Sequence, residues 1–360
     1  MHLPQTEAEL AEIIRGADSS LAIRGGGTRG VDVAGVPLGT AELAGITLYE
    51  PGAMTLVARA GTPVAQIETA LAAENQRLAF EPVDHRRMLE TEGEPTIGGV
   101  MAANVSGPRR ISVGAARDFL LGVRFVDGMG NVVKNGGRVM KNVTGYDLVK
   151  LMAGAYGTLG VLSEVSLKVL PCPETSSTLV LHGLSDAQAV AALAKALGSP
   201  FEVTAAAHDP AARETMLRVE GFAESVRYRI GALQALLGGE TSVEQDAGAR
   251  WQAWRDVAGF ATADEDIWRV SCKPSDAPAL AARSGAAAVR YDWAGGLIWL
   301  RATAGHDLRA ALGQYDGHAT LVRGSGQPRF EPEAPGVARL TSGLRARFDP
   351  RGLLNAGLMG

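Results

Sequence analysis

The sequence predicts an α+β protein of about two domains, and three observations support this fold class. The chain has 360 residues, which corresponds to roughly two domains of ordinary size. Hydrophobic residues make up 46% and charged residues 21%, as in soluble globular proteins. Helix-like and strand-like periodicities alternate along much of the chain. Disorder, collagen and coiled coil are therefore excluded as descriptions of the whole chain.

Charge, cysteine content and hydropathy exclude several further classes. With 35 basic and 39 acidic residues, the net charge of −4 gives no basic excess for nucleic acid. Cys172 and Cys272 are too few for a disulfide framework or a Cys-based metal site, and we expect two buried, reduced thiols. Residues 1–17 lack the apolar core of a signal peptide. Two of the longest uncharged runs, 96–108 and 151–163, are too short for a span of about 20 residues. We expect a cytoplasmic protein that reaches the inner membrane, if at all, through partner subunits.

The first region of the chain ends at Pro171-Cys172-Pro173. Its first helix begins at a T-x-x-E capping box, Thr6 to Glu9, with Leu10, Ile13 and Ile14 as its apolar stripe. The other elements predicted here are strands at 21–24, 46–49, 55–60 and 161–170, helices at 64–73 and 147–155, and a hairpin of 120–126 with 131–134. Residues 80–118 are predicted to be mostly loop.

The second region differs in composition, since all five tryptophans follow the Pro-Cys-Pro. Strands are predicted at 177–181, 267–272 and 297–302, and helices at 187–197, 225–237 and 277–283. This alternation is typical of a small α+β domain. The predicted division is 1–172, 173–330 and a tail, 331–360, which carries a helix at 337–347.

A glycine run, Gly25 to Gly30, matches G-x-G-x-x-G letter for letter. A Rossmann NAD site needs a helix directly after the glycines, but residues 31–37 do not read as one. The alternatives are an ordinary turn and a strand–loop nest, in which successive backbone N–H groups converge on an anion such as a pyrophosphate. Three further loops rich in small residues favour the nest and a large planar ligand: 95–107, 111–118 and 154–161.

The order of these motifs resembles the FAD-binding domain of the vanillyl-alcohol oxidase/p-cresol methylhydroxylase (PCMH) superfamily. Within it, the chain looks like the FAD-binding subunits of bacterial glycolate oxidases. The stretches that carry the resemblance are RGGGT (24–28), EPVD (81–84), TIGGVMAANVSGPRR (96–110), ARDFLLGVRFVDGMG (116–130), the segment 139–171 and FDPRGLLNAGLM (348–359). They cover 1–172 strongly, the last 25 residues moderately and the middle weakly. The resemblance implies a PCMH-type domain of two α+β subdomains, a smaller α+β cap, and a tail that returns to the flavin domain.

The same resemblance implies roles for individual residues in FAD binding. Gly25, Gly26, Gly27 and Thr28 would hold the pyrophosphate through backbone N–H groups, with Thr96, Gly98 and Gly99 lining the pyrophosphate and ribityl region. Ala102, Asn104 and Gly107 would lie along the flavin, while Gly114, Arg117 and Asp118 would close the site. Gly160 and Val161 would meet the adenine end. Asn355 would reach the isoalloxazine ring or cap a loop, and loop capping is also the alternative for Asn104 and Asp118.

Two departures from the superfamily pattern bear on the chemistry. The first glycine loop has no histidine, so we expect noncovalent FAD. His85, the only histidine well inside the domain, is predicted to be a solvated loop residue, and a covalent link to the flavin is the alternative for it. Related D-2-hydroxyacid dehydrogenases carry a His-rich metal-binding stretch where this chain has 315–323. A histidine of the ligand pair is missing, so we expect no metal, and His318 and Arg323 are the candidates for a base and a carboxylate-binding residue. A structural role is the alternative for both.

The function implied is that of an FAD-binding subunit of a complex that oxidises glycolate or another 2-hydroxy acid. Its flavin would pass electrons to partners, a second FAD-containing dehydrogenase subunit and an iron–sulfur subunit. One alternative is an autonomous flavin oxidase or dehydrogenase of a hydroxy acid or polyol. The other is a structural subunit that keeps the fold without using its flavin.

Overall fold

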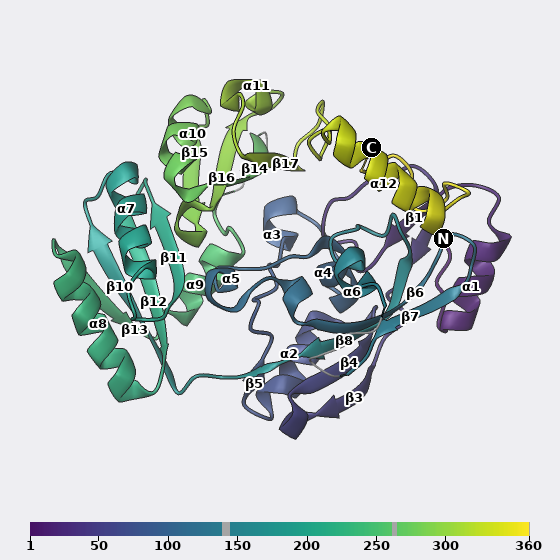
Figure 1. The fold of residues 1–360 in the computed structure, drawn as a ribbon, viewed down its shortest axis with the longest axis horizontal. Helices are drawn as coiled ribbons and strands as arrows, with labels where there is room; N and C mark the ends of the chain where they lie inside the picture. Colours follow the sequence, from purple (N-terminus) through teal and green to yellow (C-terminus); the bar gives the residue numbers. More distant parts are fainter. Residues whose placement is uncertain (139–144, 261–264, 360) are drawn as a thin grey trace.

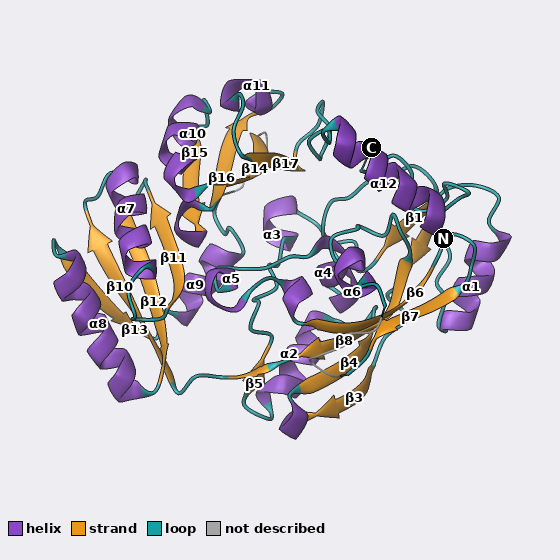
Figure 2. Cartoon of the chain, in the orientation of Figure 1, coloured by secondary structure: helices purple, strands orange, loops and turns teal. Residues whose placement is uncertain are grey.

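The computed structural model describes residues 1–138, 145–260 and 265–359. Residues 139–144, which open the resembling segment 139–171, lie outside the described residues. In Figure 1 the early, purple-to-teal part of the chain forms one sheet with short helices around it, and the later, teal-to-green part forms a second, longer sheet. Figure 2 shows that strands and helices alternate in both parts. The predicted α+β class is confirmed.

The first region is built on an antiparallel sheet. Its described strands follow the order β3-β4-β8-β6-β7, with bounds Ile46–Glu50, Thr55–Arg59, Val161–Lys168, Leu120–Val126 and Val132–Gly136. Two smaller pairs join it: the parallel β1 (Leu21–Arg24) and β2 (Val36–Gly39), and β5 (Gln76–Arg77) with β9 (Leu170–Pro171). The expected capping box begins α1 (Glu7–Gly16), where the Thr6 side chain accepts from the Glu9 N–H. The expected hairpin is β6 with β7.

The prediction of loop over 80–118 is wrong in part. Three short helices lie there, α3 (Arg86–Leu89), α4 (Ile97–Ala103) and α5 (Arg110–Val113). The sequence of α4 disfavours a helix because it contains two adjacent glycines. Two contacts override that preference: the Thr96 hydroxyl caps the helix by accepting from the Gly99 N–H, and Gly98 lies directly against Ala60. The remaining helices of this region are α2 (Val64–Ala72) and α6 (Leu148–Met152).

The second region is built on an antiparallel sheet whose strands do not follow one another in chain order. Its described strands follow the order β13-β10-β12-β11-β15-β16-β14-β17. Their bounds are Thr241–Gln245, Thr175–His182, Glu214–Gly221, Val203–Asp209, Ala288–Asp292, Leu297–Thr303, Glu265–Cys272 and Gly317–Arg323. Its helices are α7 (Asp186–Leu197), α8 (Ala223–Leu237), α9 (Gly248–Arg255), α10 (Ala277–Arg283) and α11 (Leu308–Leu312). The sequence does not predict β11, whose alanines have low strand propensity but pack fully buried in the sheet.

The last helix and the tail return to the first region. Figure 1 shows α12 (Pro335–Phe348) leading back from β17 toward the N-terminus. After it, the Leu21 N–H donates to the Leu353 carbonyl at 2.7 Å, and the Asn355 side-chain oxygen accepts from the Ile23 N–H at 2.7 Å. The predicted return of the tail is therefore confirmed, because it extends the hydrogen bonding of β1. The division at 172 and 330 stays a prediction.

Candidate flavin site

A cavity of about 390 Å³ opens between the first glycine loop, α4, the start of β8 and the tail. Eleven of the residues predicted to bind FAD line it: Gly25, Gly26, Gly27, Thr28, Thr96, Gly98, Gly99, Ala102, Gly160, Val161 and Asn355. Segments that are more than 300 residues apart in the sequence thus share one wall. The site is assembled by the fold rather than by one local motif.

Backbone donors without acceptors are the main chemical feature of this cavity. The N–H groups of Gly25, Gly26, Gly27 and Thr28 donate no hydrogen bond to any part of the chain that the structure describes. Thr28 is buried and Gly25 and Gly26 are half-buried, so solvent does not account fully for their unpaired donors. Consecutive free N–H groups at a cavity wall are the arrangement that binds an anion, so these four donors indicate a ligand that accepts from them. An FAD pyrophosphate is such an acceptor, and the residues fit it.

Close backbone contact explains why this loop contains glycines. A Cβ atom on Gly26 would lie 1.6 Å from the carbonyl oxygen of Glu94, and one on Gly93 would lie 2.3 Å from the carbonyl oxygen of Gly26. The loops 24–28 and 93–96 therefore touch through their backbones, which holds the N–H groups in place without side chains. The Rossmann alternative is wrong, because no helix follows the glycines.

The tail closes one side of the cavity through Asn355. This side chain is 3% exposed, and its amide nitrogen donates to the Tyr156 carbonyl at 2.7 Å while its oxygen accepts from Ile23. Both Asn355 and Tyr156 have positive φ, 45° and 51°. Asn355 joins β1, the tail and the Tyr156 turn, as the loop-capping alternative predicted.

Five predicted cofactor residues do not line this cavity: Asn104, Gly107, Gly114, Arg117 and Asp118. The Asn104 oxygen accepts from the Arg117 N–H at 3.0 Å, and the Asp118 carboxylate accepts from the Ala115 N–H at 2.8 Å. These bonds are the ones that the loop-capping alternative predicts, and they hold the turn after α5. The cofactor role of the five residues stays a prediction.

The two predicted catalytic residues lie on β17, at the edge of the second sheet, and neither lines the cavity. His318 is exposed and pairs with Ser271 in the strand ladder. Arg323 donates to the Met88 carbonyl at 3.1 Å and lies 3.4 Å from the Glu90 carboxylate. The structural alternative therefore describes Arg323 better. Within the described ranges no three His, Cys, Asp or Glu side chains are placed to hold a metal ion.

The expectation of a solvated His85 is wrong. The residue is half-buried, and its Nδ1 lies 3.0 Å from the guanidinium of Arg29, a cavity-lining residue. A guanidinium can only donate, so Nδ1 accepts and the ring proton sits on Nε2. Burial and the charges of Arg29, Arg269 and Arg329 hold the pKa of His85 well below its usual value. His85 is therefore neutral at physiological pH. The sequence contained no signal for this pair, which the fold brings together across 56 positions.

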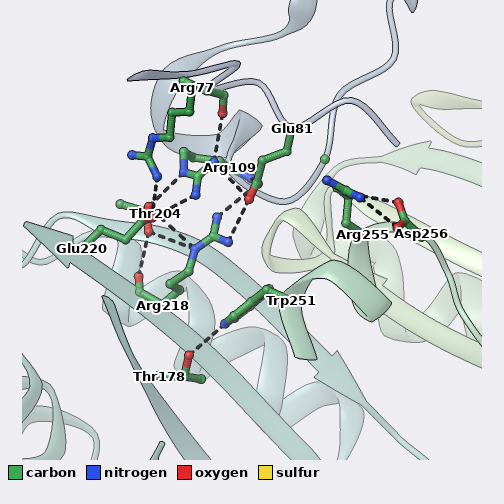
Figure 3. Close-up of polar contacts among 12 residues, drawn as sticks. Arg77, Glu81, Arg109, Thr178, Thr204, Arg218, Glu220, Trp251, Arg255 and Asp256 are labelled. Atoms are coloured by element: carbon green, nitrogen blue, oxygen red, sulfur yellow. Dashed lines mark hydrogen bonds and ion pairs between the residues drawn. The ribbon is translucent and has the colours of Figure 1, made fainter. Parts of the chain in front are cut away.

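The two regions of the chain are joined by buried ion pairs (Figure 3). Glu220 of β12 accepts from Arg109 at 2.9 Å and from Arg77 at 2.7 Å. Glu81 of the EPVD motif accepts from the Arg109 backbone N–H at 2.7 Å and from Arg218 at 2.9 Å. Three of these residues precede Cys172 and two follow it, so the network fixes one region on the other. None of its members was singled out from the sequence for this role.

A buried carboxyl group, Asp292, adjoins that network. It is 4% exposed and accepts from the Trp293 N–H at 2.7 Å. Burial, with a further contribution from the charge of Glu81, raises the pKa of Asp292 to about 7, although the Trp293 N–H and the nearby arginines oppose the shift. The folded protein therefore holds a proton there that the unfolded chain releases near pH 4.

We expect Asp292→Asn to stabilise the protein at pH 8 and to stabilise it clearly less at pH 5. The folded pKa is raised, so the wild-type carboxyl costs stability as the pH rises from about 4 to about 7. Removing that burial cost should raise the free energy of unfolding by about 2 kcal/mol at pH 8. Urea unfolding at both pH values measures this, with the exposed Asp316→Asn as the control. An equal effect of Asp292→Asn at both pH values would contradict it.

Comparisons with known proteins support the assignment of this cavity to FAD. Residues 1–136 match the model of an FAD-binding domain family. The chain is 37% identical over 317 residues to the glycolate oxidase subunit GlcE of Escherichia coli, covering 88% of this chain and 84% of that protein. It is 29% identical to the glycolate oxidase subunit GlcD of Bacillus subtilis, over 67% of this chain and 50% of that one. The solved structure of an alkyldihydroxyacetonephosphate synthase is 14% identical and superposes with a TM-score of 0.72, covering 99% of this chain and 75% of that one.

The fold and the donor-lined cavity define the class of this protein as an FAD-dependent oxidoreductase. The solved structure supports the fold alone, because its identity is low. The sequence identity to GlcE and the share of both chains that it covers are large enough to show the family. The chain belongs to the family of the glycolate oxidase subunit GlcE.

Proposed function

We propose that this chain is the FAD-binding subunit of a complex that oxidises glycolate or a similar 2-hydroxy acid and passes the electrons to partner subunits. The observation that carries the proposal is the row of unpaired N–H donors, Gly25 to Thr28, at the wall of the cavity. The named relatives GlcE and GlcD are glycolate oxidase subunits, which supports the substrate and the assembly.

In this proposal the chain's residues hold the cofactor without a covalent bond. Gly25 to Thr28 donate to the pyrophosphate, and Gly98 and Gly99 let α4 approach the ligand closely. Bound FAD supplies the redox chemistry. Gly160 and Val161 also line the cavity, and Asn355 keeps the tail against β1.

The proposed partners are a second FAD-containing dehydrogenase subunit and an iron–sulfur subunit. One face of α12 supports association with a protein: Val337, Leu340 and Leu344 are 50%, 71% and 37% exposed and recur at helical spacing. Among the described residues, no helix combines the length and hydropathy that a membrane span requires. We propose that any contact with the inner membrane is made through the partners.

The test is a visible absorption spectrum of the purified chain under anaerobic conditions, before and after glycolate is added. We expect flavin bands that persist for the chain alone and bleach when the partner subunits are present. Acid precipitation should release the flavin to the supernatant, because the binding is noncovalent. Colourless protein would overturn the assignment of FAD to this chain.

The autonomous oxidase remains the second candidate because unpaired arginines adjoin the site, as described below. Bleaching of the chain alone by glycolate would favour it over the subunit. Flavin bands that never bleach, even in the assembled complex, would instead favour a structural subunit. The three outcomes use one spectrum and are mutually exclusive.

A further inference from the structure

Two arginines from different regions lie against one tryptophan ring. The guanidinium carbon of Arg110, the first residue of α5, is 4.4 Å from the centre of the Trp293 ring. That of Arg269, on β14, is 5.1 Å from the same ring. Neither guanidinium donates a hydrogen bond or forms an ion pair within the described part of the chain. Trp293 itself is held in place, since its Nε1–H donates to the Gly107 carbonyl at 3.1 Å.

These two cations are costly to bury as they stand. Burial, followed by the charge of Arg110, lowers the pKa of Arg269 to about 10. Burial and the charge of Arg117 lower the pKa of Arg110. The acids that face them are otherwise engaged: Asp118 accepts from Ala115, and Asp292 accepts from Trp293 and is itself partly protonated near neutral pH. Both side chains are half-buried, and a charge that is largely withdrawn from water is normally paired with an opposite charge.

The positive charge continues to the wall of the flavin cavity. Arg29 lines that cavity. Arg329 donates to the carbonyl of Gly30, the residue after Arg29, at 2.7 Å. Arg269 and Arg329 both act on the pKa of His85, the partner of Arg29. The two acids on this side are used elsewhere, because Asp84 pairs with Arg86 and Glu331 accepts from the Ala319 N–H.

We propose that Arg110 and Arg269, stacked on Trp293, bind the carboxylate of a small organic acid beside the flavin. Stacking occupies the flat face of a guanidinium and leaves the N–H groups on its edge free, which is the geometry for paired hydrogen bonds to a carboxylate. The site does not include Arg323. It lies near His318, since burial and the charges of Arg269 and Arg110 lower the pKa of that histidine. The inference rests on the proposed function in two respects: that FAD binds in the cavity, and that the substrate carries a carboxylate.

The test uses the FAD-loaded chain, titrated calorimetrically with oxalate, a carboxylate that carries no hydroxyl group to oxidise. We expect Arg269→Met and Arg110→Met each to weaken oxalate binding at least tenfold, since each removes charge-assisted hydrogen bonds but keeps an apolar stem on Trp293. The control is Arg290→Met. Arg290 also stacks on a tryptophan, Trp254, at 5.0 Å, but its guanidinium already donates to the Ala258 carbonyl. This control should bind oxalate as the wild type does.

The absorbance of each sample separates failure of this inference from failure of the proposed function. Flavin retained in all variants, with oxalate binding unchanged in Arg269→Met, would overturn the carboxylate site and leave the proposed function standing. Loss of flavin from Arg269→Met and Arg110→Met would also overturn it, because the arginines would then hold the cofactor. Inorganic phosphate binding as tightly as oxalate would overturn the carboxylate class. A wild-type chain that holds no flavin would contradict the proposed function. If that flavin-free chain bound oxalate and the two variants did not, the result would still support the carboxylate site.

Discussion

Gly26→Ala should reduce the affinity for FAD at least a hundredfold. The new methyl carbon would lie 1.6 Å from the Glu94 carbonyl oxygen, which is backbone and cannot turn away as a side chain can. The loop 24–28 must therefore move from the loop 93–96, which displaces its four N–H donors. Overpacking of this kind costs about 3 kcal/mol, which corresponds to about a hundredfold in affinity. Flavin fluorescence during titration of the apoprotein measures the change.

The control for this variant is Gly52→Ala. A Cβ atom there meets nothing within 4 Å, so FAD affinity and thermal stability should both stay at the wild-type level. Gly26→Ala that bound FAD as tightly as Gly52→Ala would show that the pyrophosphate does not depend on this loop.

Glu220→Gln should destabilise the folded protein by about 3–5 kcal/mol at pH 7, because it leaves buried arginines without their counter-charge. The Glu220 side chain is 6% exposed, and those of Arg109 and Arg218 are 8% and 4% exposed. Burial by itself would raise the pKa of Glu220, but the hydrogen bonds from Arg109 and the charges of three arginines lower it. Urea unfolding of the full chain measures the loss.

The pH dependence of this effect follows from the same shift. A lowered pKa contributes stability that is fully present above the ordinary value of 4.5 and is lost as the pH falls through the folded value. The penalty of Glu220→Gln should therefore be largest near neutral pH and shrink in acid. The matched control is Glu202→Gln, whose carboxylate pairs with Arg229 but is 81% exposed, and it should cost no more than about 0.5 kcal/mol. Equal losses in the two variants would contradict a special role for the buried network.

The ion-pair network also positions the arginines of the proposed carboxylate site. Arg109 is held by Glu81 and Glu220, and the next residue along the chain, Arg110, stacks on Trp293. Trp293 in turn donates to Gly107, two residues before Arg109. The short segment 107–110 therefore connects the ion-pair network to the proposed carboxylate site.

Much of the first region could be predicted from the sequence because its signals are local. The T-x-x-E box begins α1, the glycine run forms the loop after β1, and the alternating pattern of 161–170 contains β8. The motif order also predicted the family and FAD, which the comparisons bear out. These features depend on backbone conformation and residue spacing, which neighbouring residues determine largely by themselves.

Only the tertiary structure decided which distant side chains meet. The sequence of α4 predicts a loop, and only the contact of Gly98 with Ala60 explains why it is a helix. The sequence left Asn104 and Asp118 as either ligands or loop caps, and the structure shows their loop hydrogen bonds. Arg110, Arg269 and Trp293 stand far apart in the chain, and no periodicity relates them. Their chemistry depends on burial and on missing counter-charges, which are properties of packing. The sequence determined where a dinucleotide could bind, whereas the fold decided which charges stand beside it.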